Sequence, residues 1–71
     1  MTLVELRRGL VATQSDVAAR SGLAQSLVVW LEEQPVADLD VTTLALYLRG
    51  LRGRLEAVIP APHGTERKIR L

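Results

Sequence analysis

The stretch LRRGLVATQSDVAARSGLAQSLVVWLE, residues 6–32, decides the fold of this chain. Its two short amphipathic segments, residues 14–20 and 24–31, are separated by only three residues centred on Gly22. Glycine favours an abrupt change of direction there, because it adopts positive φ values without steric cost. Two helices that cross at such a turn form a helix-turn-helix, whose second helix can enter the major groove of DNA. We therefore predict a helix-turn-helix in this stretch.

Helical patterns continue on both sides of it. A first helix is expected over residues 3–11, and a fourth over residues 41–51, after a polar, acidic loop over residues 33–40. Gly50 and Gly53 should end the fourth helix. The first helix is predicted from apolar residues at helical intervals: Leu3, Leu6, Leu10 and Val11.

The hydrophobic period changes after the last helix. Residues 54–59 read as a strand with Leu55, Ala57 and Ile59 on one face, and residues 67–71 alternate again after a turn-rich connection. A two-stranded hairpin alone is marginal in water, and pairing across a dimer two-fold would cover its open edge. We expect this strand face to form a dimer interface, whether the hairpin closes within one protomer or pairs across two.

Composition favours one small homodimeric domain. A chain of 71 residues buries a modest fraction of its surface, yet 48% of these residues are apolar. The absence of cysteine excludes a disulfide-stabilised secreted scaffold, and no apolar run is long enough to span a membrane. The cytoplasm is the expected compartment. The net charge is only +1, but eight of the nine basic residues are arginine, which suits phosphate groups.

An enzyme is not expected. The chain has no cysteine, a single histidine (His63, in a turn) and no glycine-rich phosphate loop, so we predict neither a metal nor a cofactor. These patterns together predict a mainly α fold, in which four helices precede a C-terminal β-strand or hairpin. Residues 1–52 would form the helix-turn-helix DNA-binding domain and residues 53–71 the dimerisation extension.

Several positions within residues 3–51 form a pattern without a gap: Leu6-Arg7, Thr13-Gln14, Val17-Ala18, Gly22, Gln25-Ser26 and Glu32. With this pattern, residues 3–51 resemble the lambda-repressor-like helix-turn-helix family, also called the xenobiotic-response-element type. Residues 43–59 are similar to the end of antitoxins of the HigA and HipB kind, whose C-terminal strand pairs in the dimer. The resemblance implies a homodimeric autorepressor that binds double-stranded DNA at its own palindromic operator, with a cognate toxin as a further partner.

The resemblance also implies roles for individual residues. Thr13 and Gln14, at the start of the second helix, would lie near DNA phosphate, and Gln25 and Ser26 would contact base edges from the first turn of the third. The predicted DNA-binding residues are Thr13, Gln14, Ala24, Gln25, Ser26, Leu27, Val29 and Trp30.

Arg7 and Glu32 match the positions of an internal ion pair in this family. Such a pair would tie the first helix to the end of the third. It would orient the motif and would not touch bases.

Leu27, Val29 and Trp30 depart from the family pattern, which carries polar or basic residues there. Three explanations remain open for this apolar face: contact with thymine methyl groups, contact with a protein such as a toxin or the second protomer, or a rotated helix with Trp30 in the core. The alternative functions are accordingly a protein-interaction antitoxin or adaptor with weak or no DNA binding, and a phage or restriction–modification regulator.

Overall fold

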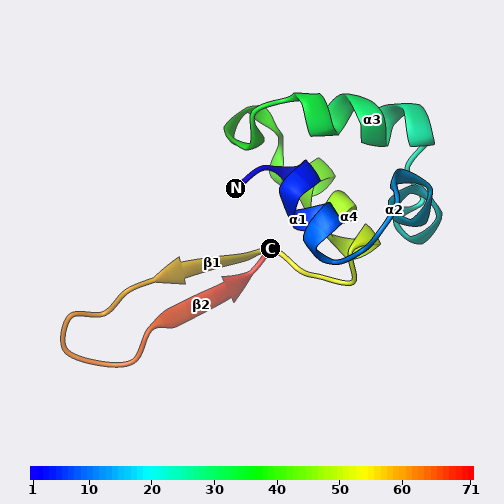
Figure 1. The fold of residues 1–71 in the computed structure, drawn as a ribbon. Helices are drawn as coiled ribbons and strands as arrows, with labels where there is room; N and C mark the ends of the chain where they lie inside the picture. Colours follow the sequence, from blue (N-terminus) through cyan, green and yellow to red (C-terminus); the bar gives the residue numbers. More distant parts are fainter.

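The computed structural model describes all 71 residues. The helices gather into one body, and the C-terminal hairpin projects from it (Figure 1). The four helices and the hairpin predicted from the sequence are confirmed. None of the helices combines the length and the apolar character needed to cross a membrane. In chain order the elements are α1 (Leu3–Gly9), α2 (Gln14–Ser21), α3 (Gln25–Glu33), the 3₁₀ helix η1 (Val36–Asp38), α4 (Val41–Gly50), β1 (Glu56–Ile59) and β2 (Arg67–Arg70).

Side-chain caps explain where three of the helices begin. Thr2, Thr13 and Asp40 each accept a hydrogen bond from a backbone amide three residues later, which satisfies one of the free donors of a helix N-terminus. Asp16 completes a capping box by accepting from the Thr13 amide. Gly22 ends α2 in the left-handed conformation, with φ 79°, as the turn between α2 and α3 requires.

The core lies where α2 packs against both α3 and α4. Gly50 belongs to this contact, because a Cβ added there would lie 2.7 Å from Val17 Cγ1. Gly50 is the last residue of α4, as predicted for the end of this helix, and its missing side chain also allows the close approach of α2. The left-handed residue after α4 is Arg52, with φ 61°. The buried apolar residues are Leu3, Ala12, Val17, Val28, Leu31, Tyr47 and Leu51.

The end of α1 differs from the prediction. The helix stops at Gly9, and Leu10 and Val11 are exposed, Val11 by 90%. The Val11 backbone adopts φ 56°, which turns the chain so that Ala12 enters the core in its place. The apolar spacing was misleading because Val11 lies beyond the last helical turn. The predicted acidic loop over residues 33–40 also contains the short η1 helix.

The hairpin closes within one protomer. β1 and β2 are antiparallel, with Ala57 opposite Ile69 and Val58 opposite Lys68. The Leu71 amide donates to the Leu55 carbonyl at 2.8 Å and extends the ladder. Because side chains alternate along a strand and paired residues share a face, the register separates an apolar face from a polar one. One face is apolar except for Arg67, which pairs with Ile59, and its other residues are Leu55, Ala57, Ile59, Ile69 and Leu71. The polar face carries Glu56, Val58, Lys68 and Arg70.

Candidate nucleic-acid interface

Helix α3 lies along the outside of the helical body (Figure 1). Val28 and Leu31 are fully buried and fix one side of the helix against the core. Trp30 is 52% exposed, so the rotated-helix explanation, with Trp30 in the core, is wrong. The residues that α3 turns toward solvent include Gln25, Ser26, Leu27, Val29 and Trp30.

The first turn of α3 is held by α2. The Ser15 hydroxyl donates to Gln25 Oε1 at 3.1 Å, which links the first turns of the two helices. This contact fixes the Gln25 amide plane and leaves its NH₂ group without a partner in the chain. Ser15 was not among the predicted site residues, because nothing in its spacing distinguishes it from an ordinary exposed serine.

The N-terminus of α3 is open, unlike those of the other three α-helices. Ala24 occupies the N-cap position and provides no side-chain hydrogen bond. The N-terminus of α2 is closed instead, since Thr13 and Asp16 cap each other. The Thr13 amide, by donating a hydrogen bond to the Asp16 carboxylate, lowers the pKa of that carboxyl, so Asp16 is ionised at neutral pH.

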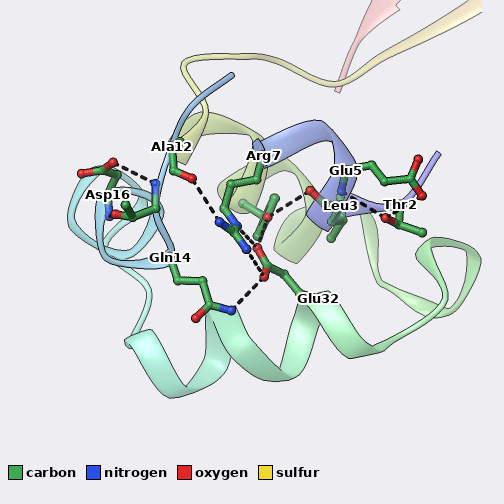
Figure 2. Close-up of polar contacts among 10 residues, drawn as sticks. Thr2, Leu3, Glu5, Arg7, Ala12, Gln14, Asp16 and Glu32 are labelled. Carbon is green, nitrogen blue, oxygen red and sulfur yellow. Dashed lines mark hydrogen bonds and ion pairs between the residues drawn. The ribbon is translucent and has the colours of Figure 1, made fainter. Parts of the chain in front are cut away.

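A buried ion pair joins α1 to the end of α3, through Arg7 and Glu32 (Figure 2). Arg7 Nε lies 2.6 Å from Glu32 Oε2 and Arg7 Nη2 lies 3.1 Å from Glu32 Oε1, in a two-pronged contact. The two side chains are only 11% and 3% exposed. Arg7 Nη1 also donates to the Ala12 carbonyl at 3.0 Å. The pair implied by the family resemblance is thus present and buried.

Two further side chains complete the shell of Glu32. The Tyr47 hydroxyl donates to Glu32 Oε2, and Gln14 Nε2 donates to Glu32 Oε1 at 2.9 Å. Gln14 therefore has a structural contact, in addition to the phosphate contact predicted for it. Tyr47 was missed by the sequence reasoning, although it stands on the same helical stripe as the leucines of α4, at Leu44, Leu48 and Leu51.

The electrostatics of this cluster favour the ionised pair. Burial alone would raise the pKa of Glu32, but hydrogen bonds from Arg7, Tyr47 and Gln14 outweigh burial and lower it below its usual value. Hydrogen bonding to Glu32 raises the pKa of Arg7. Burial, followed by the hydrogen bond to Glu32, raises the pKa of Tyr47, which keeps its hydroxyl protonated and able to donate. No buried side-chain nitrogen or oxygen is left without a partner.

The structure holds no group of three or more acidic, histidine or cysteine side chains that could bind a metal ion. The exposed face of α3 can form hydrogen bonds and apolar contacts with a partner. Uncharged polar groups, from Ser15, Gln25 and Ser26, adjoin the exposed apolar side chains of Val29 and Trp30.

Comparison with known proteins identifies relatives among solved structures. No family model matches the chain, and no curated protein matches it. One solved structure, of a HigA antitoxin described as bending DNA through a unique dimerisation, is 32% identical, covers 99% of this chain and 90% of that one, and superposes with a TM-score of 0.77. The DNA-bound antitoxin HigA3 is also 32% identical, with coverage of 100% and 88% and a TM-score of 0.78. With this identity over nearly the whole of both chains, the protein belongs to the HigA antitoxin family.

Proposed function

We propose that this protein is a cytoplasmic DNA-binding antitoxin, which acts as a homodimeric repressor of its own toxin–antitoxin module. Two structures of the family are described as DNA-bound or DNA-bending, and one as a dimer. The proposal places the chain in the broader lambda-repressor-like class, on the motif from Leu6 to Glu32. A cognate toxin is its further partner, and it has no catalytic role.

The outward face of α3 is the observation that carries this proposal. Its first turn exposes Gln25 and Ser26, whose side chains can hydrogen-bond base edges in a major groove. The buried side chains of Val28 and Leu31 hold the opposite side of the helix in the core. We assign to the DNA contact the residues Thr13, Gln14, Ala24, Gln25, Ser26, Leu27, Val29 and Trp30.

Phosphate contacts would position α3 in the groove. The uncapped amides after Ala24 suit an anion. Gln14 uses one amide hydrogen for Glu32, and its second remains for a phosphate oxygen. Thr13 is exposed beside it at the start of α2. The donors proposed for the DNA backbone are thus the open N-terminus of α3 and the side chains of Thr13 and Gln14 at the start of α2.

The hairpin supplies the dimer contact in this account, as an extension over residues 53–71 of the DNA-binding domain over residues 1–52. Its apolar face leaves Ile59 and Ile69 more than half exposed, and a two-stranded hairpin is marginal alone. Burial of Leu55, Ala57 and Ile59 against a second copy removes this apolar surface from water. A two-fold dimer then presents two α3 helices to half-sites about one helical turn apart.

The test is a gel shift on the duplex that lies immediately upstream of the coding sequence, compared with a scrambled duplex at two salt concentrations. We expect selective binding that weakens as salt rises, since phosphate neutralisation releases counterions. Gln25→Ala should reduce the affinity by roughly 1–3 kcal/mol, the value of a good base contact. Gln34→Ala, the same change at the C-cap residue that follows α3, is the matched control and should bind as the wild type does.

Equal binding to both duplexes, or binding that salt does not change, would contradict the proposal. The second candidate function is a protein-interaction antitoxin without DNA binding, which the exposed apolar side chains of α3 favour. A folded dimer that binds neither duplex but captures a co-expressed toxin would support that alternative.

A further inference from the structure

We infer, on the basis of the proposed function, that the apolar row of α3 reads thymine methyl groups, so that the operator half-site is recognised through A·T base pairs. The readers are Val29 and Trp30, flanked by Leu27, while Gln25 is placed to contact adenine. The juxtaposition that carries this inference is an exposed apolar row continuing directly from the hydrogen-bonding first turn of the same helix.

The geometry of α3 places its hydrogen-bonding residues and its exposed apolar residues on the same side of the helix. Residues four apart lie on the same helix face, so Val29 follows Gln25 by one turn and Trp30 follows Ser26. Val29 is 36% exposed and Trp30 52% exposed. A helix that inserts its first turn into a groove therefore carries these apolar side chains along the same base pairs or their neighbours. Glu33 lies one turn beyond Val29 and bounds the row at the end of the helix.

The side chains of α3 favour thymine and adenine over guanine. Thymine is the base that presents a methyl group in the major groove, and apolar side chains contact that group. Guanine is most often read by arginine or lysine, and α3, QSLVVWLEE, contains neither. Adenine is read by glutamine through its N6 and N7 atoms. The Ser15 hydroxyl holds Gln25 Oε1 in place, and that oxygen retains a second lone pair for the adenine N6 donor.

A partner protein is the competing occupant of this face. The face is continuous with polar groups that match base edges, namely Ser26 and the Gln25 amide, and it carries no charged residue before Glu32. Those features favour a duplex over a toxin surface. The thymine methyl can be removed without altering any hydrogen-bonding group of the base, so the two occupants can be separated by experiment.

The probe is the duplex immediately upstream of the coding sequence, synthesised once with thymine and once with uracil in its place. Affinities for both duplexes are measured by fluorescence anisotropy for the full-length wild type, Val29→Ala and Trp30→Ala. Val41→Ala serves as the matched control, because Val41 is also an exposed helical valine but belongs to α4. Circular dichroism establishes that each variant is folded.

We expect the wild type to bind the uracil duplex about fourfold more weakly for each thymine methyl group that the apolar row touches, from the value of one buried methyl group. Val29→Ala or Trp30→Ala should reduce or abolish this preference for thymine, and Val41→Ala should keep it. If the loss of affinity caused by uracil depends on the side chain at Val29 or Trp30, that side chain contacts the methyl group directly. A general effect of uracil on DNA stiffness would weaken the binding of every variant equally.

Equal affinity of the wild type for the two duplexes would overturn the inference and leave the proposed function intact, provided that binding stays selective over scrambled DNA. A preference for thymine that every variant retains would also overturn it. A folded Trp30→Ala variant that keeps its DNA affinity but no longer holds a co-expressed toxin would assign the face to protein. Absence of selective binding to the upstream duplex would overturn the proposed function, and the inference with it.

Discussion

At the scale of single residues, the carboxylate of Glu32 joins the four α-helices. It belongs to α3, and it accepts hydrogen bonds from Arg7 of α1 and Gln14 of α2 (Figure 2). It also accepts one from Tyr47 of α4. One buried group therefore connects α3 to each of the other α-helices, in addition to the core contacts of Val28 and Leu31. Because the proposed DNA contact depends on the position of α3, this cluster links the stability of the fold to its function.

Removing the cation of this cluster should be severely destabilising. Arg7→Ala leaves the Glu32 carboxylate buried without its partner charge, which costs about 3–5 kcal/mol. The expected result is a large drop in melting temperature, measured by circular dichroism. Arg8→Ala is the control, since the neighbouring Arg8 is exposed and should melt close to the wild type. An Arg7→Ala variant that melts like the wild type would show that the ion pair contributes nothing.

The same cluster predicts how stability depends on pH. The folded state lowers the pKa of Glu32, so the unfolded chain binds a proton more readily, and the free energy of unfolding should fall as pH drops through the acidic range below about 4.3. Urea unfolding at a series of pH values measures this slope. Asp16 and Glu56 also have lowered pKa values and contribute to it.

Glu32→Gln isolates the contribution of Glu32 to that slope. This variant should be less stable at neutral pH and should show a shallower loss of stability on acidification. Glu33→Gln is the control, because it makes the same change at the neighbouring residue, which is exposed and has no part in the ion pair. A slope unchanged by Glu32→Gln would contradict the assignment.

Family resemblance was sufficient to predict the pairing of Arg7 with Glu32. It did not predict that Tyr47 and Gln14 also bind Glu32. A tyrosine among leucines on a helical stripe is typical of ordinary core, and only the tertiary fold brings its hydroxyl from α4 to Glu32. Gln14 likewise gained its contact from the crossing of α2 and α3. The DNA-binding assignments remain predictions.

At the scale of elements, the contact between α2 and α4 depends on one glycine. A Cβ at Gly50 would meet both Cγ1 and the carbonyl oxygen of Val17 at 2.7 Å. Backbone cannot move aside as a flexible side chain can, so the two helices must separate. Helix packing here is therefore determined by the absence of a side chain, a feature that hydrophobic periodicity does not reveal.

Gly50→Ala should destabilise the protein by about 1–3 kcal/mol, the usual cost of overpacking a core. Gly9→Ala is a close match, because Gly9 is also the last residue of a helix but has open space around it. That change should be neutral or slightly stabilising, as alanine restricts the unfolded chain. Chemical denaturation compares the two, and equal stabilities would contradict the close contact.

Element boundaries were predictable where a side chain defines them. Thr13 and Asp40 signal the starts of α2 and α4, and Gly22 signals the turn before α3. The end of α1 was not predictable, because Leu10 and Val11 continue the apolar spacing after the helix has stopped. A left-handed valine has no sequence signature, and its conformation here comes from the surrounding chain.

At the scale of the whole molecule, the hairpin sets the shape. The chain extends 44 Å along its longest axis and 23 and 20 Å along the others, and the hairpin accounts for the elongation visible in Figure 1. An isolated two-stranded hairpin with an exposed apolar face is marginally stable in water. The alternation of apolar and polar residues predicted its two strands. That the strands pair with each other within one protomer is seen only in the structure.

Ile59→Asp should weaken the proposed dimer, because it removes a large exposed apolar side chain from the proposed interface; Arg67, which pairs with Ile59, stays in place. Val58→Asp is the matched control: the neighbouring residue lies on the polar face, beside Lys68. Sedimentation velocity over a range of concentrations should give a dimer for the wild type and for Val58→Asp, and a shift toward monomer for Ile59→Asp. Unchanged dimerisation of Ile59→Asp would place the interface elsewhere on the protein.

In the proposed complex, two copies of α3 occupy successive major grooves of one duplex. Hydroxyl-radical footprinting on the DNA upstream of the coding sequence would reveal this arrangement. We expect two protected patches, related by a two-fold axis and centred about one helical turn, roughly 34 Å, apart. A single patch, or uniform cleavage at protein concentrations where the dimer is folded, would contradict it.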